Sequence, residues 1–359
     1  MAGLVAAARA RELGAEPVVS EKGDRAGGSM LLSSGVVWRH RTAADFHDEC
    51  PGGDSALQRR VVDELDDALD WLESLGAPVT EPTTGNDRTV GRRFDTAGLT
   101  QALVRAAGDV RLNTAFEQPR ILATGGFGAR LARERGLLLR ANRWSEGDGL
   151  AFALARGADL TAGMDEFYGR NMPADVPEAR FVTASQLYGA HALVLDDAGR
   201  EFFPRAPSWS ETDLVQETAR QAGGAAWYVV DARALRERVR ERTVAELVEE
   251  ARAEGGDVRP AAELPFALPP SPKLREQPFL AIRVRAAVTH TTGGLRIDER
   301  ARVLDLEGAP VPDLYAAGAD AGGIFTGGYG SGLAAALVFG RIAAESALAL
   351  MSPEDMSGL

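Results

Sequence analysis

The stretch AGLVAAARARELGAEPVVSEKGDRAGGS, residues 2–29, predicts a helix, a short strand and a glycine-rich loop in that order. Residues 3–14 follow a helical pattern that ends at Gly14, and residues 16–20 have the composition of a strand. The loop at residues 23–28 follows that strand. Such an alternation of helix and strand is typical of an α/β domain built around a parallel sheet.

The alternation continues through the next hundred residues. Residues 54–75 predict an amphipathic helix, because apolar side chains recur on one stripe of its surface. Asp54 or Ser55 can cap the start of this helix, and Gly76 follows its end. Further elements are expected at residues 96–107 (a helix) and at residues 110–113 and 120–124 (strands). The first part of the chain therefore predicts one α/β domain.

The middle of the chain has a different pattern. Short strands at residues 192–195 and 226–230 mix with charged helices such as residues 232–254. The proline-rich stretch RPAAELPFALPPSPKLREQPF, residues 259–279, can continue neither element and indicates a boundary. Strand and turn signals then return, and an apolar helix is expected at residues 332–350. We therefore expect an α/β domain at residues 1–162 and 280–359, interrupted by a second domain at residues 163–279.

Composition and charge exclude several classes of function. A formal net charge of −12 argues against nucleic acid and anionic membrane surfaces as partners. One cysteine and four histidines without metal-ligand spacing predict that the protein holds no metal. The apolar run at residues 333–339 is too short to span a bilayer, and the N-terminal residues do not form a signal-peptide core. We expect a cytoplasmic protein without a membrane span.

Four segments together resemble the flavin domain of the FAD-dependent fumarate reductase and 3-ketosteroid dehydrogenase family. They are residues 2–38, the strand and turn ILATGGFGA at 121–129, the segment WSEGDGLAFALARGADL at 144–160, and the long segment at 278–344 that contains THTTGG, LYAAGAD and SGLAAALVFG. The resemblance implies an α/β fold, with a discontinuous Rossmann-like FAD-binding domain and an inserted α+β capping domain. It implies FAD as the cofactor and an oxidoreductase activity.

The resemblance also assigns residues to the cofactor. Gly3 matches the third glycine of the dinucleotide fingerprint, where a helix approaches the sheet closely, and Glu21 matches the carboxylate that binds the adenosine ribose. Asp320 falls near the ribityl chain, and the helix after it can point its N-terminus at the flavin. The full set of positions is Gly3, Glu21, Lys22, Gly27, Gly28, Ser29, Ser34, Gly35, Ala123, Thr124, Gly125, Asp148, Gly294, Gly318, Asp320, Ser331, Gly332 and Leu333.

Two departures from the family pattern leave an alternative open. The strand and the first two glycines that precede Gly3 in the fingerprint are not in this sequence, and the family's β-hairpin layer has no room before residue 121. The resemblance therefore implies an N-terminally truncated or eroded member. The alternative to an active enzyme is a flavin-free relic, which acts as a binding module or has no function.

The family moves a hydride between flavin N5 and a carbon β to a carbonyl, while a protein acid or base handles the α-proton. His290 matches the family histidine that contacts the substrate, and Tyr188 is the expected acid or base, with Tyr329 as a further catalytic candidate. Trp209 and Gly327 stand where fumarate reductases have arginines. These replacements predict an apolar, ketosteroid-like substrate with a carbonyl group rather than a dicarboxylate. The sequence does not identify the electron partner.

Overall fold

The computed structural model describes residues 1–349, which divide into two compact units. The first unit contains Met1–Arg130, Ala141–Glu166 and the chain from His290 onward. The second contains Leu131–Arg140 and Phe167–Thr289. The first unit is therefore discontinuous in sequence, because the chain leaves it and returns.

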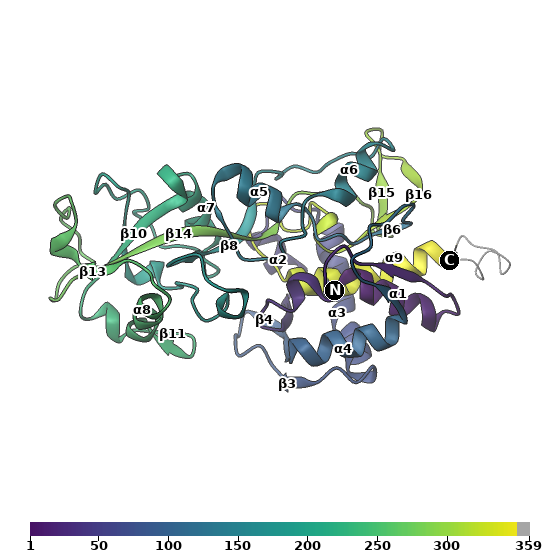
Figure 1. Ribbon diagram of the computed structural model, residues 1–359, viewed down its shortest axis with the longest axis horizontal. Helices are drawn as coiled ribbons and strands as arrows, with labels where there is room; N and C mark the ends of the chain where they lie inside the picture. Colours follow the sequence, from purple (N-terminus) through teal and green to yellow (C-terminus); the bar gives the residue numbers. More distant parts are fainter. Residues whose placement is uncertain (350–359) are drawn as a thin grey trace. The chain divides into compact units, whose positions relative to one another are not determined.

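Two helices distant in sequence form the centre of the first unit. Helix α1 (Ala2–Glu12) packs along helix α9 (Gly332–Ala349), and both are rich in buried small residues (Figure 1). At Gly340 of α9, a Cβ atom would lie 2.9 Å from the carbonyl oxygen of Ala2. Small side chains at this crossing allow the two helix backbones to approach closely. The other helices assigned to this unit are α2 (Ala43–Glu49), α3 (Ser55–Ser74), α4 (Thr96–Ala107) and α6 (Asp148–Leu154).

The strands of the first unit form three small sheets. Strand β1 (Val18–Ser20) pairs in parallel with β5 (Asp109–Arg111). Strand β16 (Pro310–Ala316) pairs in parallel with β6 (Ile121–Leu122) and antiparallel with β15 (Arg302–Leu304). Strand β4 (Thr89–Phe94) lies between β2 (Val36–His40) and β3 (Val79–Glu81). The parallel pairing of β6 with β16 places the carboxyl ends of these two strands together, and the loops that follow them carry much of the candidate site.

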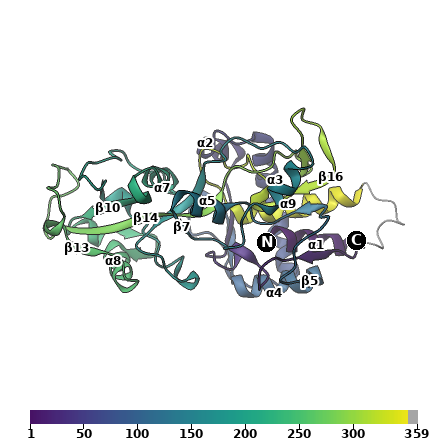
Figure 2. The same ribbon diagram turned by 45° about the horizontal axis from the view of Figure 1, so that its top comes forward.

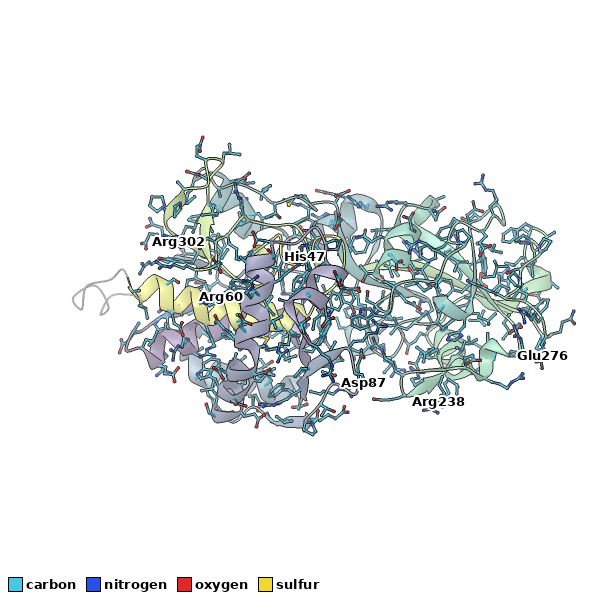
Figure 3. The ribbon with its side chains drawn as sticks, turned by 180° about the vertical axis from the view of Figure 1, so that it is seen from behind. His47, Arg60, Asp87, Arg238, Glu276 and Arg302 are labelled. Carbon is cyan, nitrogen blue, oxygen red and sulfur yellow. The ribbon has the colours of Figure 1, made fainter. Side chains whose placement is uncertain are left out.

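A buried amide fixes the loop after β16 to helices α2 and α3. The Nε2 atom of Gln58 donates to the carbonyl oxygens of Cys50 and Ile324, at 2.9 and 3.1 Å. The Oε1 atom of the same side chain lies 3.1 Å from Nδ1 of His47, a residue that is labelled in Figure 3. His47 therefore has a structural contact within the first unit.

The second unit is built on a six-stranded sheet in which β14 (Leu280–Thr291) is the longest strand. The first half of β14 lies between β10 (Ala225–Val230) and β13 (Val258–Pro260), antiparallel to both (Figure 2). Alternate residues along β10 pack into two different hydrophobic clusters, so both faces of the sheet are covered. The remaining elements of this unit are β7 (Leu138–Leu139), β8 (Phe167–Met172), β9 (Leu193–Leu195), α7 (Thr212–Ala219), β11 (Arg238–Val239), β12 (Arg242–Thr243) and α8 (Val244–Ala253); α5 (Gly128–Arg135) contains the boundary at residue 130.

Most of the elements expected from the sequence are present, and the α/β fold class is confirmed. The helix expected at residues 232–254 is wrong over its first half. Residues 234–236 form a 3-10 turn and residues 238–243 a short hairpin, so α8 begins only at Val244. Thr243 and Glu246 form a capping box at that start, which fixes the helix boundary there.

The compact units change at different residues from the expected domain boundaries. The expected return to the first domain was residue 280, but β14 pairs within the second unit from Leu280, and the chain re-enters the first unit at His290. Residues 163–166 lie in the first unit, and residues 131–140 lie in the second. That the units act as a flavin domain and a capping domain stays a proposal. Residue 350, the expected end of the last helix, lies outside the described residues.

Helix α9 is long and apolar enough to cross a membrane by length and composition. However, 61% of it is buried inside the structure, where it packs on α1 and α3. It is therefore a core helix of the first unit in this structure.

Candidate functional site

Glu21 lies directly after β1, at the carboxyl end of that strand. Its Oε1 atom accepts a hydrogen bond of 2.7 Å from the backbone N–H of Gly23. A carboxylate has about four acceptor positions on its two oxygens, so this bond leaves capacity for the hydroxyls of a ribose. The position and chemistry of Glu21 are those expected of a ribose-binding acid.

The loop after Glu21 has a backbone that favours glycine. Gly27 and Gly28 have φ angles of 105° and 53°, which residues with a Cβ rarely adopt. Ser29 follows, and its Oγ atom accepts a hydrogen bond of 3.0 Å from the backbone N–H of Asn142. Lys22 forms an ion pair of 2.6 Å with Asp148 at the start of α6. The structure thus brings Lys22, Ser29 and Asp148 to one region of the first unit.

The turn after β6 and the turn after β16 are joined by Asp320. This carboxylate is fully buried and accepts hydrogen bonds from the hydroxyl and backbone N–H of Thr124 and from the N–H of Gly126. Burial raises the pKa of Asp320 above its usual range. In this structure Asp320 joins the two strand ends, and three of the about four acceptor positions on its carboxylate are occupied by donors of the protein.

The N-terminus of α1 lies against the same two turns. A Cβ atom on Gly3 would lie 3.4 Å from the side chain of Ala123, and one on Gly318 would lie 3.0 Å from Ala2. Helix α1 has no side chain that caps its first N–H groups. These N–H groups and the helix dipole favour an anion such as a diphosphate at this position. The close approach expected at Gly3 is therefore observed, while its role toward the cofactor stays a prediction.

His290 lies beside the start of α9. Its ring atoms would be 3.2 Å from a Cβ atom on Gly332, and its ring centroid lies 5.7 Å from that of Phe325. Burial lowers the pKa of His290 to about 4, so the imidazole is neutral at pH 7. Ser331 and Leu333 flank Gly332, and the Ser331 hydroxyl accepts a bond of 3.2 Å from Ala334 in the first turn. The structure brings His290 together with three of the expected cofactor positions.

Tyr329 belongs to a group of aromatic rings in the first unit. Its ring lies 5.7 Å from Trp38, and its carbonyl oxygen lies 3.4 Å from Nε2 of the buried His40. The rings of His40 and Phe46 are 4.9 Å apart, and Phe46 stacks on Phe325 at 5.8 Å. Because the rings of Trp38 and His40 are 5.2 Å apart, contacts between rings run from Tyr329 to His290. Sequence reasoning missed Trp38 and His40, and their only signal was two aromatic residues in alternation on a short strand.

Tyr188 lies in the core of the second unit. Its side chain is fully buried, its hydroxyl donates to Oε1 of Gln186 at 2.8 Å, and its ring packs edge-on against Tyr228. Burial raises the pKa of the Tyr188 phenol. This environment gives Tyr188 a packing role, and it argues against the expected role as acid or base.

Two of the expected cofactor glycines have structural reasons of their own. A Cβ atom on Gly35 would lie 2.1 Å from the carbonyl oxygen of Phe94, and one on Gly294 would lie 2.6 Å from the carbonyl oxygen of Asp320. Both positions require glycine for close backbone contact. Ser34 is exposed beside the first of them. A Cβ atom on Gly125 would make only an ordinary contact of 3.8 Å with Ser145, although the φ of 92° at this position favours glycine.

The residues of the first unit fit FAD at its adenosine and diphosphate end. Glu21 would supply the ribose acceptor, Gly27 and Gly28 form a loop that bulky side chains would obstruct, and α1 would present an uncapped helix N-terminus to the diphosphate. Asp320 is the position that fits least well, because its carboxylate already accepts three hydrogen bonds.

Comparisons with known proteins agree with this geometry. The sequence model of a family described as "FAD binding domain" matches residues 1–125 and 113–332. A probable fumarate reductase of Shewanella frigidimarina is 24% identical over 435 aligned residues, which cover 96% of this chain and 73% of that protein. The alignment is longer than the 359-residue chain, so it contains gaps.

Two solved structures have a similar fold. The open conformation of a flavocytochrome c3 fumarate reductase gives a TM-score of 0.70 at 22% identity, covering 97% of this chain and 77% of that one. A 3-ketosteroid dehydrogenase from Rhodococcus jostii gives a TM-score of 0.70 at 18% identity, covering 96% and 94%. Because the family match spans most of the sequence, this chain belongs to the FAD binding domain family and is an FAD-dependent oxidoreductase.

Proposed function

We propose that this oxidoreductase acts on a carbon–carbon bond beside the carbonyl of an apolar, ketosteroid-like substrate. The observation that carries the proposal is the neutral, aromatic surrounding of His290 at the start of α9. A dicarboxylate such as fumarate needs cationic side chains to bind it. His290 is uncharged at neutral pH. Among the rings that lie between His290 and Tyr329, only the imidazole of His40 can carry a charge.

Bound FAD supplies a hydride acceptor or donor at N5. The protein's own residues would hold the adenosine ribose at Glu21 and the diphosphate at the glycine loop and the α1 N-terminus. The neutral imidazole of His290 can donate a hydrogen bond from its N–H group to a substrate carbonyl, and neither group becomes charged. The phenol of Tyr329 is the candidate proton donor or acceptor for the α-carbon. Tyr329 replaces Tyr188 in this role because Tyr188 is buried in a hydrophobic core.

The reaction is tested by anaerobic mixing of FAD-loaded protein with a 3-ketosteroid or with succinate. The 3-ketosteroid is expected to bleach the visible flavin absorbance, because oxidation of the substrate reduces the bound cofactor. Succinate is expected to leave the absorbance unchanged. Bleaching by succinate but not by the steroid would contradict the proposed substrate class.

A substitution tests the role of Tyr329. Tyr329→Phe should slow the bleaching by about 100-fold or more, which is the usual loss when a general acid or base is removed. Tyr315→Phe is the matched control, because the Tyr315 hydroxyl donates to the carbonyl of Ser346 in the protein core. Equal rates for the Tyr329 variant and the wild type would exclude this residue as the acid or base.

We further propose that the protein works in the cytoplasm. The burial of α9, the one described helix apolar enough to span a membrane, inside the first unit supports the part of this proposal that places no described helix in a membrane. The proposed reaction requires an electron acceptor as partner, because the cofactor must be reoxidised after the steroid is dehydrogenated.

A further inference from the structure

Trp144 lies beside the loop that follows Glu21. If Gly23 carried a Cβ atom, that atom would lie 2.7 Å from Cδ1 and 2.8 Å from Nε1 of Trp144, and 3.0 Å from Oε1 of Glu21. Any side chain at position 23 would therefore collide with the indole. The pyrrole edge of Trp144 and the Glu21 carboxylate therefore both lie within 3.0 Å of one point beside Gly23.

A set of hydrogen bonds holds the segment that carries Trp144. The backbone N–H of Trp144 donates to Oδ1 of Asn142 at 3.3 Å, and the Asn142 N–H donates to the Ser29 hydroxyl at 3.0 Å. On the other side, the hydroxyl of Ser145 donates to the Asn142 carbonyl at 2.7 Å and accepts from the N–H of Ala129 at 3.1 Å. The indole is thus positioned by contacts to the glycine loop and to the start of α5.

A neighbouring guanidinium covers one face of the indole. The Arg143 guanidinium lies 5.3 Å from the ring centroid, a cation–π arrangement, and it pairs with Asp24 at 3.3 Å. Trp144 is only partly buried. Gly23 contacts the ring at its edge, so the face opposite Arg143 is not occupied by that contact. An aromatic face next to a ribose-binding carboxylate is suited to a purine ring.

We propose that Trp144 is the adenine-binding residue of the cofactor site, with its indole stacked on the adenine of FAD. The inference rests on the proposed FAD site, since it takes the position of the ribose from Glu21. It extends that site by a side chain that binds the base by stacking, and the indole beside residue 23 explains why that residue is glycine. ADP, which has the adenosine and the diphosphate without the flavin, should therefore bind the same site.

The test measures dissociation constants of FAD and ADP for the full chain and three variants. Base–aromatic stacking contributes to the affinity, so Trp144→Ala should weaken the binding of both ligands about tenfold. Trp144→Phe keeps an aromatic ring and should keep most of the affinity. Trp71→Phe is the control, because Trp71 lies on α3 and donates to Glu12. ADP should also quench the tryptophan emission of the wild type and of Trp71→Phe, but not that of Trp144→Phe.

The outcomes separate this inference from the function on which it rests. FAD binding by the wild type with an unchanged dissociation constant in Trp144→Ala would overturn the adenine assignment alone. A weakened Trp144→Ala variant without quenching of the wild type by ADP would also overturn it, since the residue would then act only through the loop. A wild-type chain that takes up neither ligand would overturn the FAD site and the inference together.

Discussion

Glu21 is the side chain on which the adenosine end of the site depends. Two charge-assisted hydrogen bonds to ribose hydroxyls are worth about 1.5–3 kcal/mol each. Glu21→Ala should therefore weaken FAD binding by at least about tenfold, since 1.4 kcal/mol corresponds to a factor of ten. Glu16→Ala is the control, because Glu16 is an exposed acid just before β1. Equal FAD dissociation constants for the Glu21 variant and the wild type would show that the ribose lies elsewhere.

Glu211 gives the second unit a dependence on pH. Its carboxyl group is buried and accepts hydrogen bonds from the N–H groups of Gly189 and Ala190, yet burial raises its pKa from 4.5 to about 7. A pKa higher in the folded than in the unfolded chain adds stability that is full below about pH 4.5 and is lost as the pH rises through about 7.

The prediction concerns the free energy of unfolding at pH 5 and pH 8. Between these values the wild type should lose about 2 kcal/mol more than Glu211→Gln, since one pKa unit corresponds to 1.36 kcal/mol and the variant cannot ionise at this position. Urea unfolding of both proteins at each pH measures the difference. Parallel changes in the two proteins would mean that Glu211 is ionised in the fold at neutral pH.

Individual residues show how far the sequence could predict the site. The dinucleotide fingerprint correctly placed Glu21 after β1 and Gly3 at a close approach of its helix. Both features depend on the local sequence pattern. It did not predict that Asp320 would join two turns, since this depends on the pairing of β6 with β16. Nor did it predict the burial of Tyr188, which depends on side chains from distant parts of the second unit.

Gly35 lies between the glycine-rich loop and β2, and its substitution tests how closely the chain approaches β4. Gly35 has a φ of 73°, and a Cβ atom there would lie 2.1 Å from the carbonyl oxygen of Phe94, the last residue of the paired strand β4. Gly85 has a similar φ of 66° with nothing within 4 Å of such an atom. Both Gly→Ala changes strain the backbone, but only the first also collides with a strand.

Gly35→Ala should therefore destabilise the protein more than Gly85→Ala does. We expect about 1 kcal/mol for the strain in each variant and at least about 1 kcal/mol more at position 35. Chemical denaturation of the two variants beside the wild type gives the comparison. Equal losses would mean that the approach of residue 35 to β4 is relaxed at little cost.

Elements with strong local signals were predicted well. Helix α4 has the expected bounds of residues 96–107, and Asp54 caps α3 by accepting from the N–H groups of Ala56 and Leu57. The early start expected for α8 failed because a hairpin replaces its first turns. Charged residues in that stretch suit an exposed hairpin as well as a helix, and only tertiary pairing decides between them.

At the level of the whole molecule, the order of the four family-like segments predicted the arrangement of the fold better than any single motif did. Elements from both ends of the chain meet in the first unit, where α1 packs on α9 and β6 pairs with β16. Each of these contacts joins residues separated by most of the sequence. The resemblance of four ordered segments to one family implied that arrangement, whereas the boundary at His290 required the pairing of β14.

The central claim is that the first unit is an FAD site, and a direct titration tests it. FAD added to the purified chain should bind saturably at one equivalent, with a change in the visible flavin spectrum, because Glu21, the glycine loop and the α1 N-terminus are in place. FMN, which lacks the adenosine, should bind much more weakly. A chain that remains colourless after exposure to FAD, with no saturable binding, would contradict the claim and favour a flavin-free binding module.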